Sequence, residues 1–206
     1  ANPKADLLLI DKLIIQCELA DINIVIVINK CDLMSDEEID KLSKQYSYYN
    51  VVCCSSISNY GISEIKKLIK GNVSFFAGQS GVGKSSLINC VSKELSHETG
   101  NISKKLKRGK HTTRHVELSY IPDLEGSILD TPGFSFYDFK DDFSIEETYR
   151  EFDGLREKCR FTGCTHVNEP DCAVKAHVGE TINKLRYERY VQIFEMQKEM
   201  REKQYD

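Results

Sequence analysis

Apolar residues in the first 95 positions alternate between short β-branched runs and longer helical patterns. Residues 5–19 carry apolar side chains around most of a helical wheel, which predicts a helix packed against a sheet. The run from Ile22 to Ile28 is apolar on both faces and predicts a buried central strand. Further strands are expected at 51–54 and 73–77, and further helices at 35–45, 63–70 and 87–95. This alternation predicts an α/β domain with a doubly wound, mostly parallel sheet.

The pattern changes after residue 95. Residues 96–114 are polar and basic without apolar periodicity, which predicts a loop. Ser144 and Glu147 form a capping-box pattern that predicts a helix to about Phe152. Two strands are expected at 116–121 and 127–129, and a long charged helix at 180–204.

A glycine-rich segment between the third strand and the next helix fits the pattern G-x-x-x-x-G-K-[ST]. In such a loop the backbone N–H groups surround a phosphate chain, the lysine meets the β and γ phosphates, and the hydroxyl after it ligates Mg²⁺. We therefore expect a phosphate site with Lys84 on the phosphates and Ser85 on Mg²⁺. The predicted binding residues of this segment are Gly78, Gln79, Ser80, Gly81, Val82, Gly83, Lys84, Ser85 and Ser86.

The base is selected elsewhere, in the segment Asn29-Lys30-Cys31-Asp32 after the most hydrophobic strand. The Asp32 carboxylate can accept both N1–H and N2–H₂ of guanine, a donor pair that adenine lacks. Asn29 is expected to brace the loop, and the stem of Lys30 to lie over the base. Ser55 and Ser56, after the strand at 51–54, are candidates to present a backbone amide to guanine O6.

The segment Asp130-Thr131-Pro132-Gly133 follows another predicted strand, where a nucleotide hydrolase places an acid near Mg²⁺ and a glycine near the γ-phosphate. Thr112 and Thr113, in the basic loop, are candidates to close over Mg²⁺, with Thr113 as the ligand. Ras-like enzymes carry a water-orienting Gln after D-x-x-G, but Phe134 stands here and has no hydrogen-bonding group. His111 is the best candidate in this chain to orient the water.

The order of these motifs differs from that of Ras-like GTPases, in which the phosphate loop comes first. Here the base-binding residues 29–32 and 55–56 precede the phosphate loop at 78–85. The order predicts a circularly permuted GTPase domain over residues 1–153. An ATP-dependent P-loop enzyme is the weaker alternative, and Asp32 argues against it.

Three cysteines and one histidine cluster near the C-terminus in the pattern Cys159-x₄-Cys164-x-His166-x₅-Cys172. Three thiolates and an imidazole form a complete tetrahedral set, which favours a structural Zn²⁺. Redox pairing of two of these cysteines is the alternative. We expect residues 154–206 to form a small, helical zinc-binding domain that ends in the long helix.

Composition narrows the class of protein further. The 206 residues are 40% hydrophobic and 29% charged with four prolines, which is typical of a globular chain and excludes fibrous classes. The longest apolar run, Ile24 to Ile28, is far short of a membrane span, and no signal peptide is recognisable, so we expect a cytoplasmic protein. The net charge of −4 argues against nucleic-acid binding through overall charge, but residues 104–114 hold six Lys/Arg and no acid.

These motifs together resemble one family, the circularly permuted, ribosome small-subunit-dependent GTPases (the RsgA family). The resemblance rests on NKCD, GQSGVGKSS, GKHTTRHVEL, DTPGF and CRFTGCTHVNEPDCAV and spans essentially the whole chain. It implies a GTPase that acts late in small-subunit maturation, binds ribosomal RNA and is stimulated by the subunit, with GTP or GDP, Mg²⁺ and one structural Zn²⁺ bound. Family members also carry an N-terminal OB-fold domain; none is recognisable in these 206 residues, and we expect it to be lost, trimmed or supplied separately.

Two functions stay open at this point. One is an enzyme that hydrolyses GTP and thereby acts as a molecular switch on the small ribosomal subunit. The other is a nucleotide-gated RNA-binding module with vestigial hydrolysis. Both use the same pocket, so the motifs do not separate them. We expect a monomer in either case, with no membrane partner.

Overall fold

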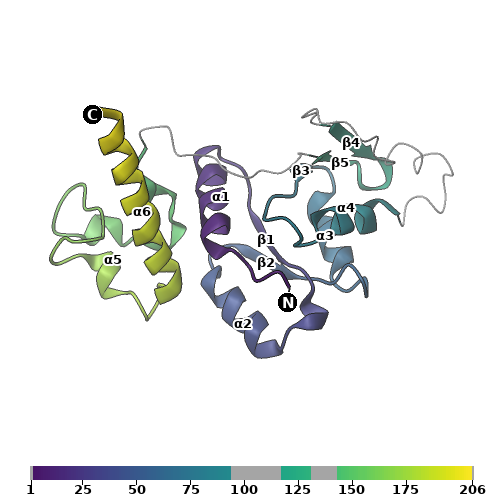
Figure 1. Ribbon diagram of the computed structural model, residues 1–206, viewed down its shortest axis with the longest axis horizontal. Helices are drawn as coiled ribbons and strands as arrows, with labels where there is room; N and C mark the ends of the chain where they lie inside the picture. Colours follow the sequence, from purple (N-terminus) through teal and green to yellow (C-terminus); the bar gives the residue numbers. More distant parts are fainter. Residues whose placement is uncertain (1, 94–116, 131–142, 206) are drawn as a thin grey trace. The chain divides into compact units, whose positions relative to one another are not determined.

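The computed structural model describes residues 2–93, 117–130 and 143–205 (Figure 1). The chain forms two compact units that interleave along the sequence. The first unit holds residues 1–5, 27–39 and 52–137, and the second holds 6–26, 40–51 and 138–206. These units are groupings by contact, and the predicted division into domains 1–153 and 154–206 stays a prediction.

A three-stranded sheet organises the first unit, in the order β3 (Val73–Phe75), β5 (Gly126–Asp130) and β4 (Glu117–Ile121). Strands β3 and β5 are parallel, with Val73 opposite Ser127, and β4 is antiparallel to β5. Helices α3 (Ile62–Ile69) and α4 (Lys84–Lys93) pack against each other beside this sheet (Figure 1). The predicted α/β class is confirmed.

A second, two-stranded sheet joins β1 (Val25–Ile28) to β2 (Asn50–Cys53). Between them lie a 3-10 turn, η1 (Cys31–Leu33), and helix α2 (Asp36–Gln45). The predicted capping box of α2 is confirmed, because the Ser35 amide donates to the Glu38 carboxylate at 3.0 Å and the Glu38 amide donates to Ser35 Oγ at 3.3 Å.

Strand β1 begins at Val25, three residues later than its apolar run predicts. The Ile22 amide donates to the Cys17 carbonyl at 2.9 Å and so closes the end of the preceding helix. Asp21 adopts a φ of 52°, which turns the chain away from the helix axis. Ile22 therefore belongs to the helix terminus, and 40% of its surface stays exposed.

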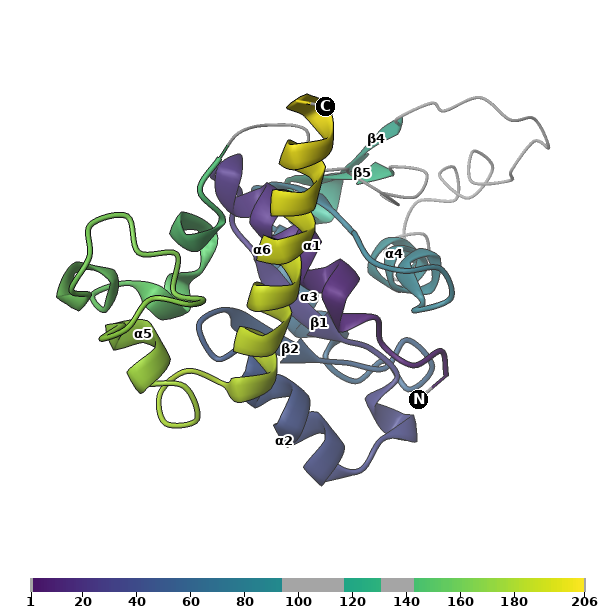
Figure 2. The same ribbon diagram turned by 60° about the vertical axis from the view of Figure 1, so that its left-hand side comes forward.

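In the second unit, helix α1 (Leu7–Leu19), the short helix α5 (Ala173–Ala176) and the long helix α6 (Lys184–Tyr205) share a hydrophobic core, and a smaller core joins α1 to Tyr46 and Tyr49. Ile15 of α1 lies in the same core as Cys164, Cys172 and Tyr190. Figure 2 shows α6 running alongside α1. The metal-ligand candidates and the first helix are therefore packed as one body.

Two segments of this unit differ from their predicted form. Residues 144–152 form two 3-10 helices, η3 (Ile145–Thr148) and η4 (Arg150–Phe152), rather than one capped α-helix. Ser144 makes no side-chain cap, and Tyr149 between the turns is extended, with φ −100° and ψ 101°. The break places Ile145, Tyr149 and Phe152 together in the core, and this packing outweighs the local capping signal.

Helix α6 begins at Lys184 rather than Glu180 because the preceding residues are held in a turn. Gly179 donates to the Ile182 carbonyl at 2.8 Å, and Ile182 donates to the His177 carbonyl at 3.1 Å. Asn183 Oδ1 then accepts from the amides of Leu185 and Arg186 and starts the helix. Among the helices described, none combines the length and apolar character needed to cross a bilayer.

Candidate functional site

Within residues 2–93 and 117–130, the predicted nucleotide-binding motifs lie at the carboxyl ends of strands or shortly after them. Asn29 follows β1, Ser55 lies two residues after β2, and the phosphate loop from Gly78 follows β3. Asp130 is the last residue of β5, which runs parallel to β3. Ligands of open α/β sheets bind at this end of the strands.

The phosphate loop, residues 78–85, curls around the ammonium of its own lysine. Lys84 Nζ donates to the carbonyls of Gly78 at 2.6 Å and Gln79 at 2.8 Å. Partial burial lowers the pKa of Lys84. The hydroxyl-bearing residues Ser80, Ser85 and Ser86 are exposed. Both carbonyls are neutral acceptors, which Lys84 can exchange for phosphate oxygens.

Asn29 joins the base-binding loop to the phosphate loop and to the serine loop. Its Nδ2 donates to the Val82 carbonyl at 2.9 Å, while its Oδ1 accepts from the Ser56 amide at 3.4 Å and from Cys54 Sγ at 3.6 Å. Gly83, with φ 98°, makes room for this side chain, because a Cβ there would lie 2.3 Å from Asn29 Nδ2. The predicted bracing role of Asn29 therefore has a direct structural basis.

Lys30 and Asp32 lie in the turn that follows β1. Lys30 adopts the left-handed conformation, with φ 63°, and its Nζ donates to the Gly81 carbonyl at 2.8 Å. Asp32 lies in η1, and its side chain is exposed. Selection of guanine by this exposed carboxylate stays a prediction.

The serine loop uses its polar groups internally. Ser55 is 1% exposed, and its Oγ accepts from the amides of Ile57 and Ser58 at 3.3 and 3.2 Å. The Ser55 amide donates to the Tyr60 carbonyl at 3.0 Å. In this arrangement Ser55 shapes the loop, and contact of Ser55 or Ser56 with guanine O6 stays a prediction.

The residues predicted to act on the γ-phosphate, His111, Thr112, Thr113 and Gly133, lie outside the described residues. For Asp130 the structure describes the backbone, which pairs with Glu117 in the register of β4 and β5. Their catalytic and magnesium-binding roles stay predictions.

The four metal-ligand candidates, Cys159, Cys164, His166 and Cys172, converge in the second unit. Their ligand atoms all lie within 4.8 Å of one another, and Cys164, His166 and Cys172 are buried. Burial lowers the pKa of His166, which favours the neutral imidazole that binds metals. Burial raises the pKa of Cys164 to about 12, and a bound cation would favour its thiolate form.

The spacing of these atoms fits a tetrahedral centre. With Zn–S bonds of about 2.3 Å and Zn–N bonds of about 2.0 Å, two sulfurs are about 3.8 Å apart and a sulfur and nitrogen about 3.5 Å apart. Cys159 Sγ lies 3.8 Å from Cys172 Sγ, and His166 Nδ1 lies 3.6 and 3.4 Å from these two sulfurs. A disulfide requires an S–S distance of about 2.05 Å. The cysteines are free thiols, so the geometry favours a metal over redox pairing.

Glu169 supports the loop that carries His166, a role that the sequence analysis did not assign. Its carboxylate accepts from the Thr165 amide at 2.8 Å, from Thr165 Oγ1 at 2.7 Å and from the Val167 amide at 3.2 Å. Burial raises the pKa of Glu169, but these hydrogen bonds outweigh it and hold the pKa at about 2. An acid three residues after a turn histidine is the sequence signal that indicates such a brace.

Comparison with known proteins agrees with this geometry. The sequence model of the RsgA GTPase family matches residues 1–140. A Clostridium beijerinckii protein named small ribosomal subunit biogenesis GTPase RsgA is 42% identical over 200 residues, which cover 94% of this chain and 68% of the relative. A Halalkalibacterium halodurans protein of the same name is 44% identical over 205 residues, covering 95% and 68%. The chain thus spans about two thirds of the length of these relatives.

Two solved structures share the fold. The crystal structure of YjeQ from Thermotoga maritima aligns with a TM-score of 0.78 at 34% identity, covering 95% of this chain and 67% of that one. The structure of YloQ, described as a circularly permuted GTPase, aligns with a TM-score of 0.76 at 32% identity, covering 97% and 66%. Sequence, motif order and fold agree, and this chain belongs to the RsgA GTPase family.

Proposed function

We propose that this chain binds GTP and hydrolyses it to GDP and phosphate as a switch in late maturation of the small ribosomal subunit. Family membership supports the hydrolysis, and the printed names of the relatives support the link to subunit biogenesis. The observation that carries the proposal is the bond from Asn29 Nδ2 to the Val82 carbonyl, which joins the base-binding loop to the phosphate loop.

Different residues of the first unit bind the base and the phosphates of the nucleotide. Asp32 selects guanine, and the stem of Lys30 covers the base. The amides of residues 78–86 and the ammonium of Lys84 bind the phosphates. Lys84 fits this role because its ammonium already lies within the loop, where it donates to the neutral carbonyls of Gly78 and Gln79.

A divalent cation completes the phosphate site. The hydroxyls of Ser85 and Thr113 hold Mg²⁺, and Asp130 lies near it. When bound, Mg²⁺ neutralises negative charge on the phosphates. Ser85 fits because it is exposed at the end of the phosphate loop.

The chemical step depends on residues outside the described ranges. His111 orients the attacking water, Thr112 and Thr113 close over the nucleotide, and the Gly133 amide meets the γ-phosphate. The small subunit stimulates turnover by ordering the segment around His111, so that less free energy is spent on closing it.

The Cys159, Cys164, His166 and Cys172 cluster holds one structural Zn²⁺. A four-ligand set leaves no open coordination position for a reacting water, so the ion supplies stability. The fit rests on the ligand spacing of 3.4 to 3.8 Å among Cys159, His166 and Cys172.

The basic run from Lys104 to Arg114 contacts ribosomal RNA, and the protein acts as a monomer.

The test measures nucleotide affinity and GTP turnover of the purified chain with and without purified small subunits. We expect guanine nucleotides to bind with a large preference over adenine nucleotides, and slow turnover that rises on addition of subunits. Binding of GTP with no turnover in either condition would favour a nucleotide-gated binding module instead. Absence of guanine nucleotide binding would overturn the proposal.

A further inference from the structure

The first residues of the chain lie on both nucleotide-binding loops. Lys30 Nζ donates to the Asn2 carbonyl at 2.7 Å as well as to the Gly81 carbonyl at 2.8 Å. Gln79 Nε2, in the phosphate loop, donates to the Lys4 carbonyl at 2.9 Å. Residues 2–4 and the two loops belong to the same compact unit. We call residues 2–4 the N-terminal strap.

Packing adds to these hydrogen bonds. A Cβ placed on Gly81 would lie 3.5 Å from Pro3 Cδ and 3.6 Å from Pro3 Cγ, so the proline ring faces the bend of the phosphate loop. Proline restricts the backbone of its own residue and of the residue before it, and thereby limits the positions that the Asn2 carbonyl can take. The strap therefore holds two carbonyl acceptors, those of Asn2 and Lys4, in place beside the two nucleotide-binding loops.

The position of Lys30 shows why a second acceptor matters. Its backbone is in the left-handed region, with φ 63°, which is an unfavourable conformation for a non-glycine residue. A lysine side chain also loses conformational entropy when it is held in one place. The two carbonyls, one from the phosphate loop and one from the strap, hold the ammonium and so fix the stem that leads to it.

We propose that the N-terminal strap is a positioning element for the guanine nucleotide, which holds Lys30 and the phosphate loop together in the arrangement that receives the ligand. The inference rests on the proposed function, since it concerns the same nucleotide. The strap acts through backbone carbonyls, so sequence motifs do not reveal it. It touches Lys30 and Gln79 and performs no chemistry itself.

The direction of the effect follows from pre-organisation. A loop pair that is already docked loses less entropy when the nucleotide binds, which raises affinity. The opposite possibility is that the strap covers the site and must leave before the nucleotide enters. The contact from Lys30 to Gly81 favours the first, because the strap acceptor reinforces the docked state of the two loops.

The experiment deletes residues 1–4 and measures GDP affinity and dissociation rate by fluorescence of a labelled GDP. Asp6 stays in place, so its carboxylate still accepts from the Leu9 amide and caps α1. We expect a rise of about three- to tenfold in Kd, mostly through faster dissociation, as for the loss of an exposed hydrogen bond to a charged group. Deletion of Ala1 alone, which keeps the strap, is the matched control and leaves the Kd unchanged.

A second variant replaces residues 2–4 by three glycines, which keeps the chain length and the carbonyls but frees the backbone. We expect it to raise the Kd for GDP by less than the deletion does. It replaces the deletion as the test if the deletion lowers the melting temperature of the protein. Lys30→Ala alone weakens GDP binding, and the deletion then adds less in the Lys30→Ala background than in the parent. This non-additivity separates positioning of Lys30 from a general loss of stability.

The outcomes are distinguishable. A parent chain that fails to bind GDP overturns the proposed function. If the parent binds GDP and the deletion binds it equally well, the strap proposal is wrong. Tighter binding by the deletion variant identifies residues 2–4 as a cover and also overturns the proposal, as does full additivity with Lys30→Ala.

Discussion

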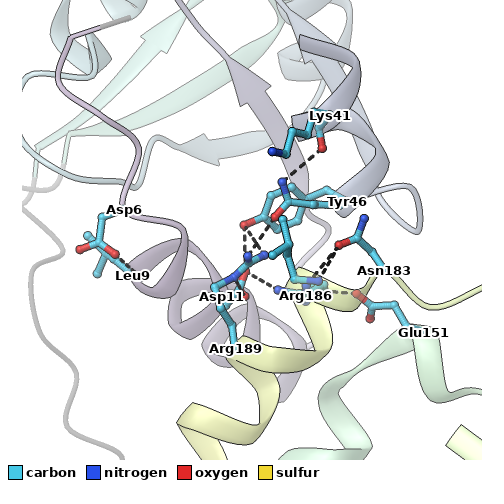
Figure 3. A network of polar contacts seen from close by, with 11 residues as sticks. Asp6, Leu9, Asp11, Lys41, Tyr46, Glu151, Asn183, Arg186 and Arg189 are labelled. Carbon is cyan, nitrogen blue, oxygen red and sulfur yellow. Dashed lines mark hydrogen bonds and ion pairs between the residues drawn. The ribbon is translucent and has the colours of Figure 1, made fainter. Parts of the chain in front are cut away.

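Arg186 of α6 forms an ion pair with Asp11 of α1, although 175 residues separate them, and both side chains are buried, at 1% and 0% exposure. Figure 3 shows the network around this pair. Arg186 Nε donates to Glu151 Oε1 at 2.7 Å, and Arg189 Nε donates to Asp11 Oδ2 at 2.5 Å. The Arg186 guanidinium also lies 4.6 Å from the ring centre of Tyr149. The last helix is therefore bound to the first by charges that water does not screen.

Loss of Arg186 is expected to be costly because its partners stay behind. Arg186→Met leaves two buried carboxylates with fewer partners, and we expect the free energy of unfolding to fall by about 3–5 kcal/mol. Urea denaturation followed by circular dichroism measures the change. Lys184→Met, in the same helix but 74% exposed and 4.0 Å from Glu188, is the control and changes stability by about 0–1 kcal/mol. Similar small losses for both variants would show that the buried pair is not stabilising.

Metal removal is expected to loosen α1 as well as the metal-binding loop. Ile15 of α1 shares a core with Cys164 and Cys172. Tyr187 Oη of α6 donates to the His166 carbonyl at 2.7 Å, and Arg186 of the same helix pairs with Asp11 of α1. Hydrogen exchange after chelation should therefore show lost protection in residues 7–19 and 184–205, while α3 keeps its protection. Cys164→Ser should behave as the chelated protein, and Cys17→Ser should keep one zinc per chain. Full protection of α1 without metal would contradict the shared core.

The guanine preference is expected to depend on one carboxylate. Asp32→Asn removes an acceptor for N1–H and N2–H₂ and should weaken GDP binding by about 100-fold or more, since the partner groups lose charge-assisted hydrogen bonds. The same variant should gain affinity for xanthosine diphosphate, whose edge suits an amide. Competition titrations with both nucleotides measure the switch. Asp36→Asn, an exposed neighbour at the start of α2, should keep the parent preference, and an unchanged preference in Asp32→Asn would remove the assignment.

Subunit stimulation is expected to depend on His111. His111→Ala should lose most of the subunit-stimulated GTP turnover and keep both GTP affinity and the slow basal rate, because the proposed function gives the imidazole its water-orienting role in the stimulated reaction. Turnover with and without small subunits measures the effect, and His97→Ala is the control that keeps full stimulation. A His111→Ala enzyme that the subunit stimulates fully would show that another group holds the water.

Local signals predicted the elements whose stabilising contacts are close in sequence. The Ser35 and Glu38 capping box closes within four residues, and the phosphate loop is one contiguous motif between a strand and a helix. The four metal-ligand candidates span only fourteen positions, 159 to 172, so spacing alone identified them. The structure agrees with the capping box, with the strand and helix around the loop and with the convergence of the four side chains, because each depends on residues close in sequence. Binding of nucleotide and metal by these residues stays a prediction.

The same signals failed where packing outweighed local preference. Ser144 and Glu147 carry the letters of a capping box, yet the chain breaks at Tyr149 to bury three large side chains in one core. Ile22 has the apolar character of a strand residue, yet its amide ends α1. In both places a distant or neighbouring element decides the backbone conformation.

The sequence by itself indicated the family, the candidate phosphate and base-binding motifs with their permuted order, and the candidate metal-ligand set, because each depends on a short pattern of residue types whose chemistry has few alternatives. Only the tertiary structure decided that Asn29 bonds to Val82, that Lys30 shares acceptors from Asn2 and Gly81, and that Asp11 pairs with Arg186. These contacts join residues 28 to 175 positions apart, and no local pattern encodes such pairs. Burial makes an unpaired charged group costly, which accounts for the pairing of Asp11 with Arg186. The exposed Lys30 contacts instead depend on how the folded chain brings residues 2 and 81 within reach of the same ammonium.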